Sequence, residues 1–182
     1  TTDNETLCWG IEGAGIIPAP EGYSFRTLSA SPSEHTCGIT TLGATVCWGR
    51  SHHDADVAPG GSVFKTVSTG QSHNCGITMD DEAECWGRND YGESDPPDGT
   101  FSMVAASENF SCGIRTGGEA ICWGDDEMGG LDVPEGHTFT TLSTRQHLTC
   151  GLTTEHEIIC WGVHWYEEYY GLYDMPTTIP EP

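Results

Sequence analysis

Nine cysteines are the residues whose spacing in this sequence is most regular. Zinc sites gather cysteines or histidines with two to four residues between them, and no two of these cysteines are that close. Eight of them instead form four pairs with a separation of ten positions, which places two cysteines opposite each other across a hairpin. The spacing therefore predicts the disulfides Cys37–Cys47, Cys75–Cys85, Cys112–Cys122 and Cys150–Cys160.

Four disulfides of this kind indicate an oxidising compartment, so we expect the protein to be extracellular or at a cell surface. Closing each loop of about 11 residues stabilises the fold by roughly 2.7 kcal/mol in the chain-entropy model. Cys8 has no internal partner if the other eight cysteines pair. It is then free, bonded to another chain, or bonded to a segment outside this sequence.

A second set of residues with chemical potential lies between Arg50 and Asp56. His52, His53 and Asp54, together with Asp56, could bind a metal and support a metal-dependent hydrolase. A polar, exposed loop is the favoured interpretation. The sequence contains no Ser/His/Asp arrangement in a recognisable context and no glycine-rich phosphate loop. We therefore expect no enzymatic activity, no cofactor and no metal.

Two further histidines, His35 and His73, each lie two residues before a cysteine. Phe110 and Leu148 occupy the same position before two other cysteines. Apolar residues in that position indicate that it packs inside the protein, so catalysis by these histidines is not expected.

The charge of the chain excludes some partners. The sequence has 28 acidic and six basic residues, which gives a net charge of −22. Such a surface repels phosphate backbones, so nucleic-acid binding is not expected. A soluble surface and adaptation to high salt both account for this charge. The acidic runs 80–82 and 125–127 lack the spacing of a calcium loop and are interpreted as solvated. No apolar run approaches the roughly 20 residues that span a membrane, so membrane insertion is not expected.

The elements that must position these residues come from an internal repeat. A Cys-Trp-Gly motif begins at five cysteines, and successive motifs are 39, 38, 37 and 38 residues apart. One unit shows three predicted strands, Phe64–Ser68, His73–Thr78 and Ala83–Gly87, followed by a longer loop, Arg88–Thr100. The motifs begin at Cys8, Cys47, Cys85, Cys122 and Cys160.

Each unit is predicted to be a small antiparallel sheet with two apolar faces. The midpoint between paired cysteines falls on a residue, so the hairpin turn has an odd number of residues. Alternation along the strand puts Trp86 on the face opposite to Cys85, and we expect Trp86 to face the next unit. Neighbouring units must cover both faces. The sequence thus predicts an all-β protein, either a β-propeller or an open arc of propeller blades.

We expect four complete blades of three or four antiparallel strands and about 38 residues each, plus a partial N-terminal blade. The predicted divisions are a partial blade at 1–24, blades at 25–62, 63–99, 100–137 and 138–176, and a Thr/Pro tail at 177–182.

These repeats resemble those of the regulator of chromosome condensation superfamily. The resemblance rests on the strand pair Val67-Ser68, the segment Ser72–Ile77, and the run Cys85–Gly92. The repeats look most like the short, cysteine-paired type of secreted prokaryotic members, which include β-lactamase inhibitor propellers. The family includes nucleotide-exchange factors, enzyme inhibitors and surface proteins, so the resemblance implies a propeller fold without implying one activity. Family rings commonly have seven blades, which is more than this sequence contains.

Several residues apart from the paired cysteines are candidates for binding or modification. An aromatic cluster after the last Cys-Trp-Gly could cap the last blade, support self-assembly, or bind a protein or glycan. Asn4 and Asn109 lie in N-glycosylation triplets, so they are candidate sites of a glycoprotein. The aromatic cluster consists of Trp165, Tyr166, Tyr169, Tyr170 and Tyr173.

Three arrangements fit the incomplete first repeat: a small closed ring, a segment of a longer product, or an open arc whose end faces meet other copies. The leading hypothesis is a secreted, non-enzymatic structural component that assembles with itself, in one form as a filament. The alternative is a propeller that recognises a protein or glycan through the loops between its blades.

Overall fold

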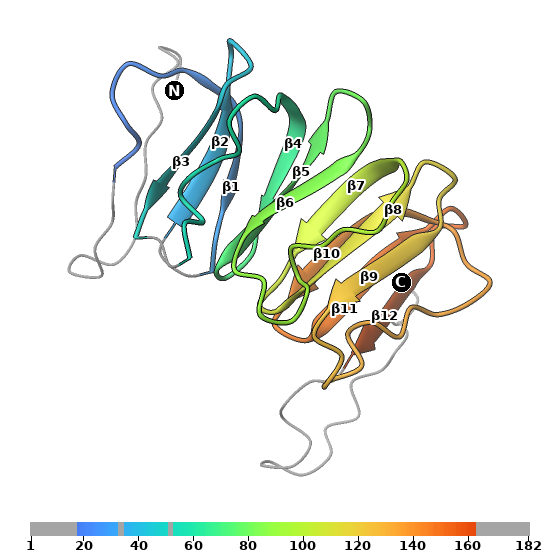
Figure 1. Cartoon of the computed structure of the whole chain (residues 1–182). Helices are drawn as coiled ribbons and strands as arrows, with labels where there is room; N and C mark the ends of the chain where they lie inside the picture. Colours follow the sequence, from blue (N-terminus) through green and yellow to red (C-terminus); the bar gives the residue numbers. More distant parts are fainter. Residues whose placement is uncertain (1–17, 33–34, 51–52, 163–182) are drawn as a thin grey trace, which may run out of the picture.

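The computed structural model describes residues 18–32, 35–50 and 53–162 of the chain, and every regular element in these ranges is a β-strand (Figure 1). Twelve strands form four antiparallel sheets of three strands, which we call blades 1 to 4. None of the described segments is a helix that could cross a membrane. Blade 1 contains β1 (Phe25–Ala30), β2 (His35–Thr40) and β3 (Thr45–Gly49); blade 2 contains β4 (Phe64–Thr69), β5 (His73–Thr78) and β6 (Ala83–Gly87); blade 3 contains β7 (Phe101–Ala106), β8 (Phe110–Arg115) and β9 (Ala120–Gly124); and blade 4 contains β10 (Phe139–Arg145), β11 (Leu148–Thr153) and β12 (Ile158–Gly162).

The strands of blade 2 lie close to their predicted positions. Both β5 and β6 have the predicted bounds, whereas β4 is one residue longer than predicted. The extra residue is Thr69, which pairs with Asn74 and donates its backbone N–H to Ser29 Oγ of blade 1 at 3.0 Å. Contact with the neighbouring blade therefore extends the strand beyond the limit indicated by local sequence.

Each hairpin between the second and third strands has the odd number of turn residues that the cysteine spacing predicts. In blade 2, Thr78 N–H donates to Glu82 O at 2.9 Å, and Asp81 N–H donates to Thr78 O at 3.1 Å. Asp81 has a φ of 65°, the left-handed conformation that ends a three-residue turn. The corresponding residues with positive φ in the other blades are Gly43, Gly118 and His156.

The hairpins bring the paired cysteines into direct register, and all four pairs form disulfides in the structure. Their Cα atoms are 4.0 Å apart in each case. The cysteines are cross-strand partners, as in the pair Cys75 and Cys85. Cys8 lies outside the described residues.

The glycine after each first cysteine makes room for the phenylalanine that starts the blade. A Cβ atom built on Gly76 would lie 2.4 Å from Cδ1 of Phe64. The pairing of β4 with β5 shifts by one residue between Phe64 and Thr66, and the same irregularity recurs in every blade. The Phe ring therefore lies against the backbone of the second strand at the glycine, and it is fully buried in blade 2.

The blades stack side by side in an arc, with the first strands β1, β4, β7 and β10 adjacent to one another (Figure 1). The second strand of each of the first three blades packs against the first strand of the following blade. Blades 1 and 4 lie at opposite ends of the arc, so the described blades form an open propeller-like arc and not a closed ring.

The apolar core lies between blades. Cys75 and Ile77 of blade 2 pack against Phe101 and Trp123 of blade 3, and the equivalent residues pack between blades 1 and 2. Trp86 belongs to the cluster that contains Cys37 and Ile39 of blade 1. The prediction that Trp86 faces the next blade was therefore wrong. Because the cysteine face of each blade meets the next blade, alternation points the tryptophan towards the preceding one.

We predict that Gly76→Ala lowers the free energy of unfolding by about 1–3 kcal/mol, because the added methyl group forces Phe64 out of its packed position. Gly117→Ala is the matched control, since nothing lies within 4 Å of the added Cβ and the residue has no positive φ. Its unfolding free energy should stay within about 0.5 kcal/mol of the parent. Denaturant titration of the oxidised proteins measures both, and an unchanged Gly76→Ala midpoint would contradict the packing described.

Candidate functional site

The interfaces between blades contain polar contacts that repeat at fixed positions. The residue before the first cysteine of blades 2, 3 and 4 is polar and fully buried, and its side chain lies against the disulfide of the preceding blade. The contacts join Cys37 Sγ to Asn74 Oδ1 (3.5 Å), Cys75 Sγ to Ser111 Oγ (3.4 Å) and Cys112 Sγ to Thr149 Oγ1 (3.7 Å). These residues were not predicted from the sequence, although a polar residue stands directly before the first cysteine of every blade.

The histidines near the cysteines belong to the same interfaces. His35 Nε2 lies 2.9 Å from Asn74 Oδ1, and His73 Nε2 lies 2.8 Å from Ser111 Oγ. Both imidazoles are buried, and Phe110 is buried at the equivalent position. The position is a packing position, as the sequence indicated, and the histidines add a hydrogen bond between blades.

The loop that carries the candidate metal ligands has a structural role. His53 and Asp54 both have positive φ angles, 61° and 57°, and they direct Ala55 into the protein, where it is fully buried. The carbonyl oxygen of Ala55 accepts hydrogen bonds from Asn74 Nδ2 at 2.7 Å and from Trp86 Nε1 at 3.3 Å. No group of three or more metal-ligating side chains occurs among the described residues, and His52 lies outside them.

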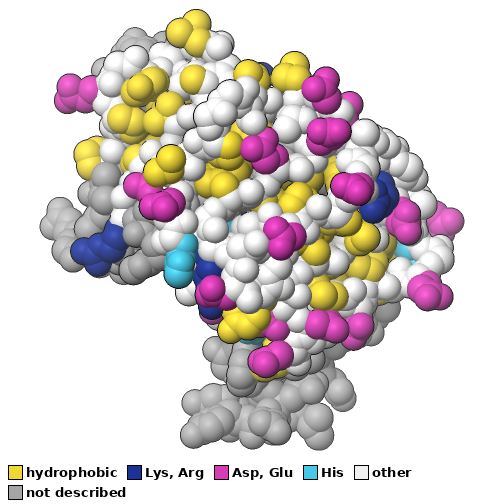
Figure 2. Space-filling model, in the orientation of Figure 1, with side chains coloured by type: hydrophobic (Ala, Val, Ile, Leu, Met, Phe, Trp, Pro, Cys, Tyr) yellow, Lys and Arg dark blue, Asp and Glu magenta, His cyan; other side chains and the backbone are white. Residues whose placement is uncertain are grey.

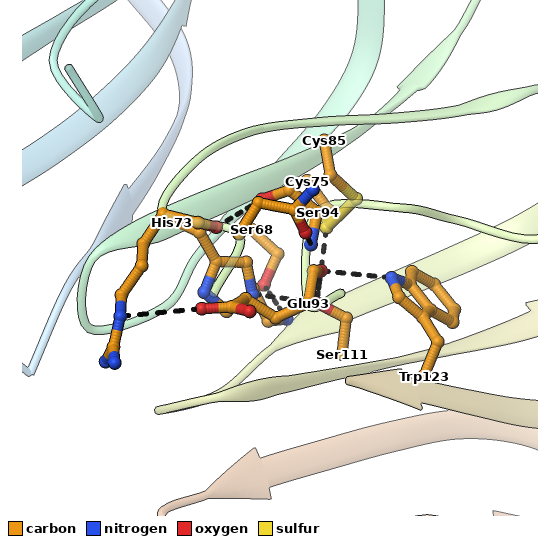
Figure 3. The surroundings of a disulfide bond; sticks show 11 residues. Ser68, His73, Cys75, Cys85, Glu93, Ser94, Ser111 and Trp123 are labelled. Atoms are coloured by element: carbon orange, nitrogen blue, oxygen red, sulfur yellow. Dashed lines mark hydrogen bonds and ion pairs between the residues drawn. A yellow bond between two sulfur atoms is a disulfide. The ribbon is translucent and has the colours of Figure 1, made fainter. Parts of the chain in front are cut away.

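The equivalent loop of blade 2 buries a carboxylate, Glu93, beside the Cys75–Cys85 disulfide (Figure 3). Its backbone carbonyl accepts hydrogen bonds from Trp123 Nε1 at 3.0 Å and Ser111 Oγ at 3.1 Å. The backbone N–H of Tyr91 donates to Glu93 Oε2 at 2.8 Å. Sequence analysis did not identify Glu93, because Ala55 and Gly130 hold the equivalent positions and neither predicts a buried charge there.

Arg88 partly offsets the burial of the Glu93 carboxylate. Its Nε lies 3.8 Å from Glu93 Oε1 and donates to Asp90 Oδ2 at 2.7 Å. This hydrogen bond raises the pKa of Arg88 and lowers the pKa of Asp90. Arg88 also donates to Asn109 Oδ1 at 2.9 Å, so one side chain ties the loop of blade 2 to blade 3. The cluster holds the loop in place.

The glycosylation triplet at Asn109 is part of this folded region. Asn109 accepts the hydrogen bond from Arg88, and its amide nitrogen lies 3.5 Å from Asp125 Oδ2. The hydroxyl residue of the triplet, Ser111, is fully buried. Modification of Asn109 remains a prediction, and it would have to precede folding. Asn4 and the aromatic residues 165–173 lie outside the described residues.

A groove runs along the first strands on the inner side of the arc. One part has a volume of about 740 Å³ and is lined by the loops that follow these strands; a second part, of about 410 Å³, lies along the strands themselves. Glu108 and Arg145 are the charged residues of the larger part, and the smaller part has none. The hydroxyl groups that line one or both parts are those of Thr27, Ser31, Thr66, Ser68, Thr69, Ser102, Ser107, Ser143 and Thr144.

Acidic side chains are spread over the face shown in Figure 2, and few basic ones accompany them. The hydroxyl groups in the lining of the groove can donate hydrogen bonds to a polar ligand and accept them from it, and apolar side chains such as Val104 and Leu142 lie between them.

The chain matches the model of the regulator of chromosome condensation (RCC1) repeat at residues 64–93 and 104–129, which lie in blades 2 and 3. No curated protein sequence matches the chain. Solved structures do match. The ectodomain of the Physcomitrella patens receptor kinase CR4 has a TM-score of 0.72 and 26% identity, and covers 90% of this chain and 45% of its own.

The CRINKLY WD40 ectodomain of the Arabidopsis thaliana receptor kinase ACR4 has a TM-score of 0.66 and 27% identity, with 78% of this chain and 51% of its own covered. Prp20p of Saccharomyces cerevisiae, which binds Gsp1p and histones, has a TM-score of 0.69 and 14% identity. The match covers 80% of this chain and 47% of Prp20p. At that identity the likeness shows the fold alone. The chain spans about half the length of these three structures.

The buried histidine of blade 2 predicts a dependence of stability on pH. Burial, with repulsion from His35 and Arg88, lowers the pKa of His73 from 6.5 to about 4. In the unfolded chain His73 takes up a proton below about pH 6.5, whereas in the folded protein it stays neutral down to about pH 4. Its contribution to stability is therefore complete above pH 6.5 and is lost as the pH falls towards 4, by about 3 kcal/mol.

His73→Phe copies the residue at the equivalent position of blade 3 and should remove this dependence. Between pH 7 and pH 4 the unfolding free energy of the parent should fall by about 3 kcal/mol more than that of the variant, because only the parent loses the His73 contribution. Parallel curves over this range would contradict the burial of a neutral imidazole.

Proposed function

We propose that this chain, which is built of RCC1-like β-propeller repeats, is a secreted, non-enzymatic structural component of the extracellular space or cell surface that assembles with copies of itself. The observation that carries the proposal is the state of the last blade. Blades 1, 2 and 3 each bury their cysteine face against the following blade. In blade 4 this face points towards the end of the arc.

The difference in burial is clear at equivalent residues. Cys37, Cys75 and Cys112 are fully buried, whereas Cys150 is only partly buried. Ile39, Ile77 and Ile114 are likewise buried, and their counterpart Leu152 is partly exposed. Ile158, at the start of β12, is 45% exposed. An apolar face of this kind on a soluble protein is typical of an interface.

Two observations support an extracellular location. The four disulfides are stable in an oxidising compartment and rare in a reducing one. Two of the structures that resemble the chain are ectodomains of receptor kinases, which lie outside the cell. The same features fit the alternative function, a propeller that recognises a protein or glycan through the loops between its blades. The groove beside the loops that follow the first strands offers such a partner a polar surface.

The two functions differ in the mass of the protein in solution. We predict that size-exclusion chromatography with light scattering detects species larger than one chain. The larger species should increase with salt, because the repulsion between copies of net charge −22 is screened within about 3 Å at 1 M salt. A strict monomer at low and high salt would contradict self-assembly and leave the binding module as the function.

A further inference from the structure

We infer that the exposed face of blade 4 in one copy receives blade 1 of a second copy, in a joint that repeats the three interfaces inside the chain. This inference rests on the proposed self-assembly and names the two surfaces that meet. The internal interfaces provide the pattern. The cysteine face of one blade is covered by side chains of the next blade: the Phe that starts its first strand, the Val or Leu three residues later, and the Trp of its third strand.

Blade 1 lacks cover at the positions where the other blades are covered. Leu28 is 47% exposed, whereas its counterparts Val104 and Leu142 are 6% and 4% exposed and Val67 of blade 2 is partly buried. Phe25 is only partly buried, although Phe64 and Phe101 are fully buried. Trp48 differs from the other blade tryptophans in that it is buried although no described blade precedes it, so the apolar side chains that blade 1 leaves at least partly exposed for the joint are those of Phe25 and Leu28.

The polar positions of blade 1 also fit the face of blade 4. Thr36 is the residue before the first cysteine of its blade, and it is partly exposed, while Asn74, Ser111 and Thr149 are fully buried at the equivalent position. In the joint, Thr36 of the second copy would lie against Cys150, as Thr149 lies against Cys112 within the chain.

The first strands supply a second polar match. Within the chain, Ser29 Oγ accepts from Thr69 N–H, and Ser68 Oγ accepts from Ala106 N–H, both at 3.0 Å. The repeat places Ser143 of blade 4 at the accepting position and the backbone N–H of Ala30 at the donating position. Ser143 and Ala30 are both exposed in the structure, so each is available to a second copy.

A second copy is the occupant favoured by continuity with the internal interfaces, because blade 1 carries the same Phe and Trp positions with which blades 2, 3 and 4 cover the blade before them. A head-to-tail joint closes into a ring if the rotation permits and otherwise forms a filament.

Three lysine substitutions with the same change of charge test the joint. Leu28→Lys alters blade 1, Ile158→Lys alters blade 4, and Met79→Lys, at a hairpin turn of blade 2 that is 57% exposed, is the control. Within the chain, Ala120 of blade 3 and Leu142 of blade 4 pack in one cluster. Ile158 is equivalent to Ala120 and Leu28 to Leu142, so a lysine in place of Ile158 or Leu28 puts an unpaired charge in the joint. Each should weaken self-association by about tenfold or more, and Met79→Lys should not.

Mixing the two interface variants gives the sharper result. Blade 4 of Leu28→Lys and blade 1 of Ile158→Lys are both unaltered, so an equimolar mixture should form a pair of one copy of each and stop there. Light scattering of the single variants and the mixture reads this directly.

If the parent assembles but both variants assemble equally well, the proposed joint is wrong while self-assembly stands. If both variants are monomeric and the mixture is also monomeric, the head-to-tail arrangement is wrong. If the parent itself is monomeric, the proposed function fails and the inference fails with it.

Discussion

The structure depends on one constraint, which is that no blade has a complete core of its own. A sheet of three short strands has two faces and cannot bury either of them by itself. The cysteine face of each blade is completed by the phenylalanine and tryptophan of the following blade, as Cys75 is by Phe101 and Trp123. The folding of one blade therefore depends on the presence of the next blade. The faces at the two ends of the arc need a partner to be covered in the same way.

The other regular features follow from this packing. The disulfide holds the second and third strands in register, so the cysteine face is rigid when the next blade packs on it. The glycine after the cysteine lets the Phe ring lie on the strand, where it is covered in turn by the preceding blade. The buried polar residues and the carbonyls of the connecting loops then satisfy hydrogen bonds between blades, which fixes the position of each blade on its neighbour.

The sequence predicted what is decided within one repeat and missed what is decided between repeats. Cysteine spacing and turn residues specify the hairpins, so the strand bounds of β5 and β6 and the disulfides could be predicted. The direction of Trp86 could not, because alternation separates two faces without saying which neighbour each one meets. Glu93 is buried by contacts with blade 3 and by Arg88, and no local pattern marks it. The loop at His53 was open to a metal-site interpretation because the burial of Ala55 depends on Asn74, 19 residues away.

Amide hydrogen exchange at different protein concentrations tests the completion of blade faces most directly. The account predicts that β5 and β8, which are covered within the chain, are protected equally at all concentrations. It predicts that protection of β11, on the blade whose face is exposed, is weaker at low concentration and rises as a second copy covers it. Protection of β11 that equals that of β5 at the lowest concentration, or that does not change with concentration, would contradict it.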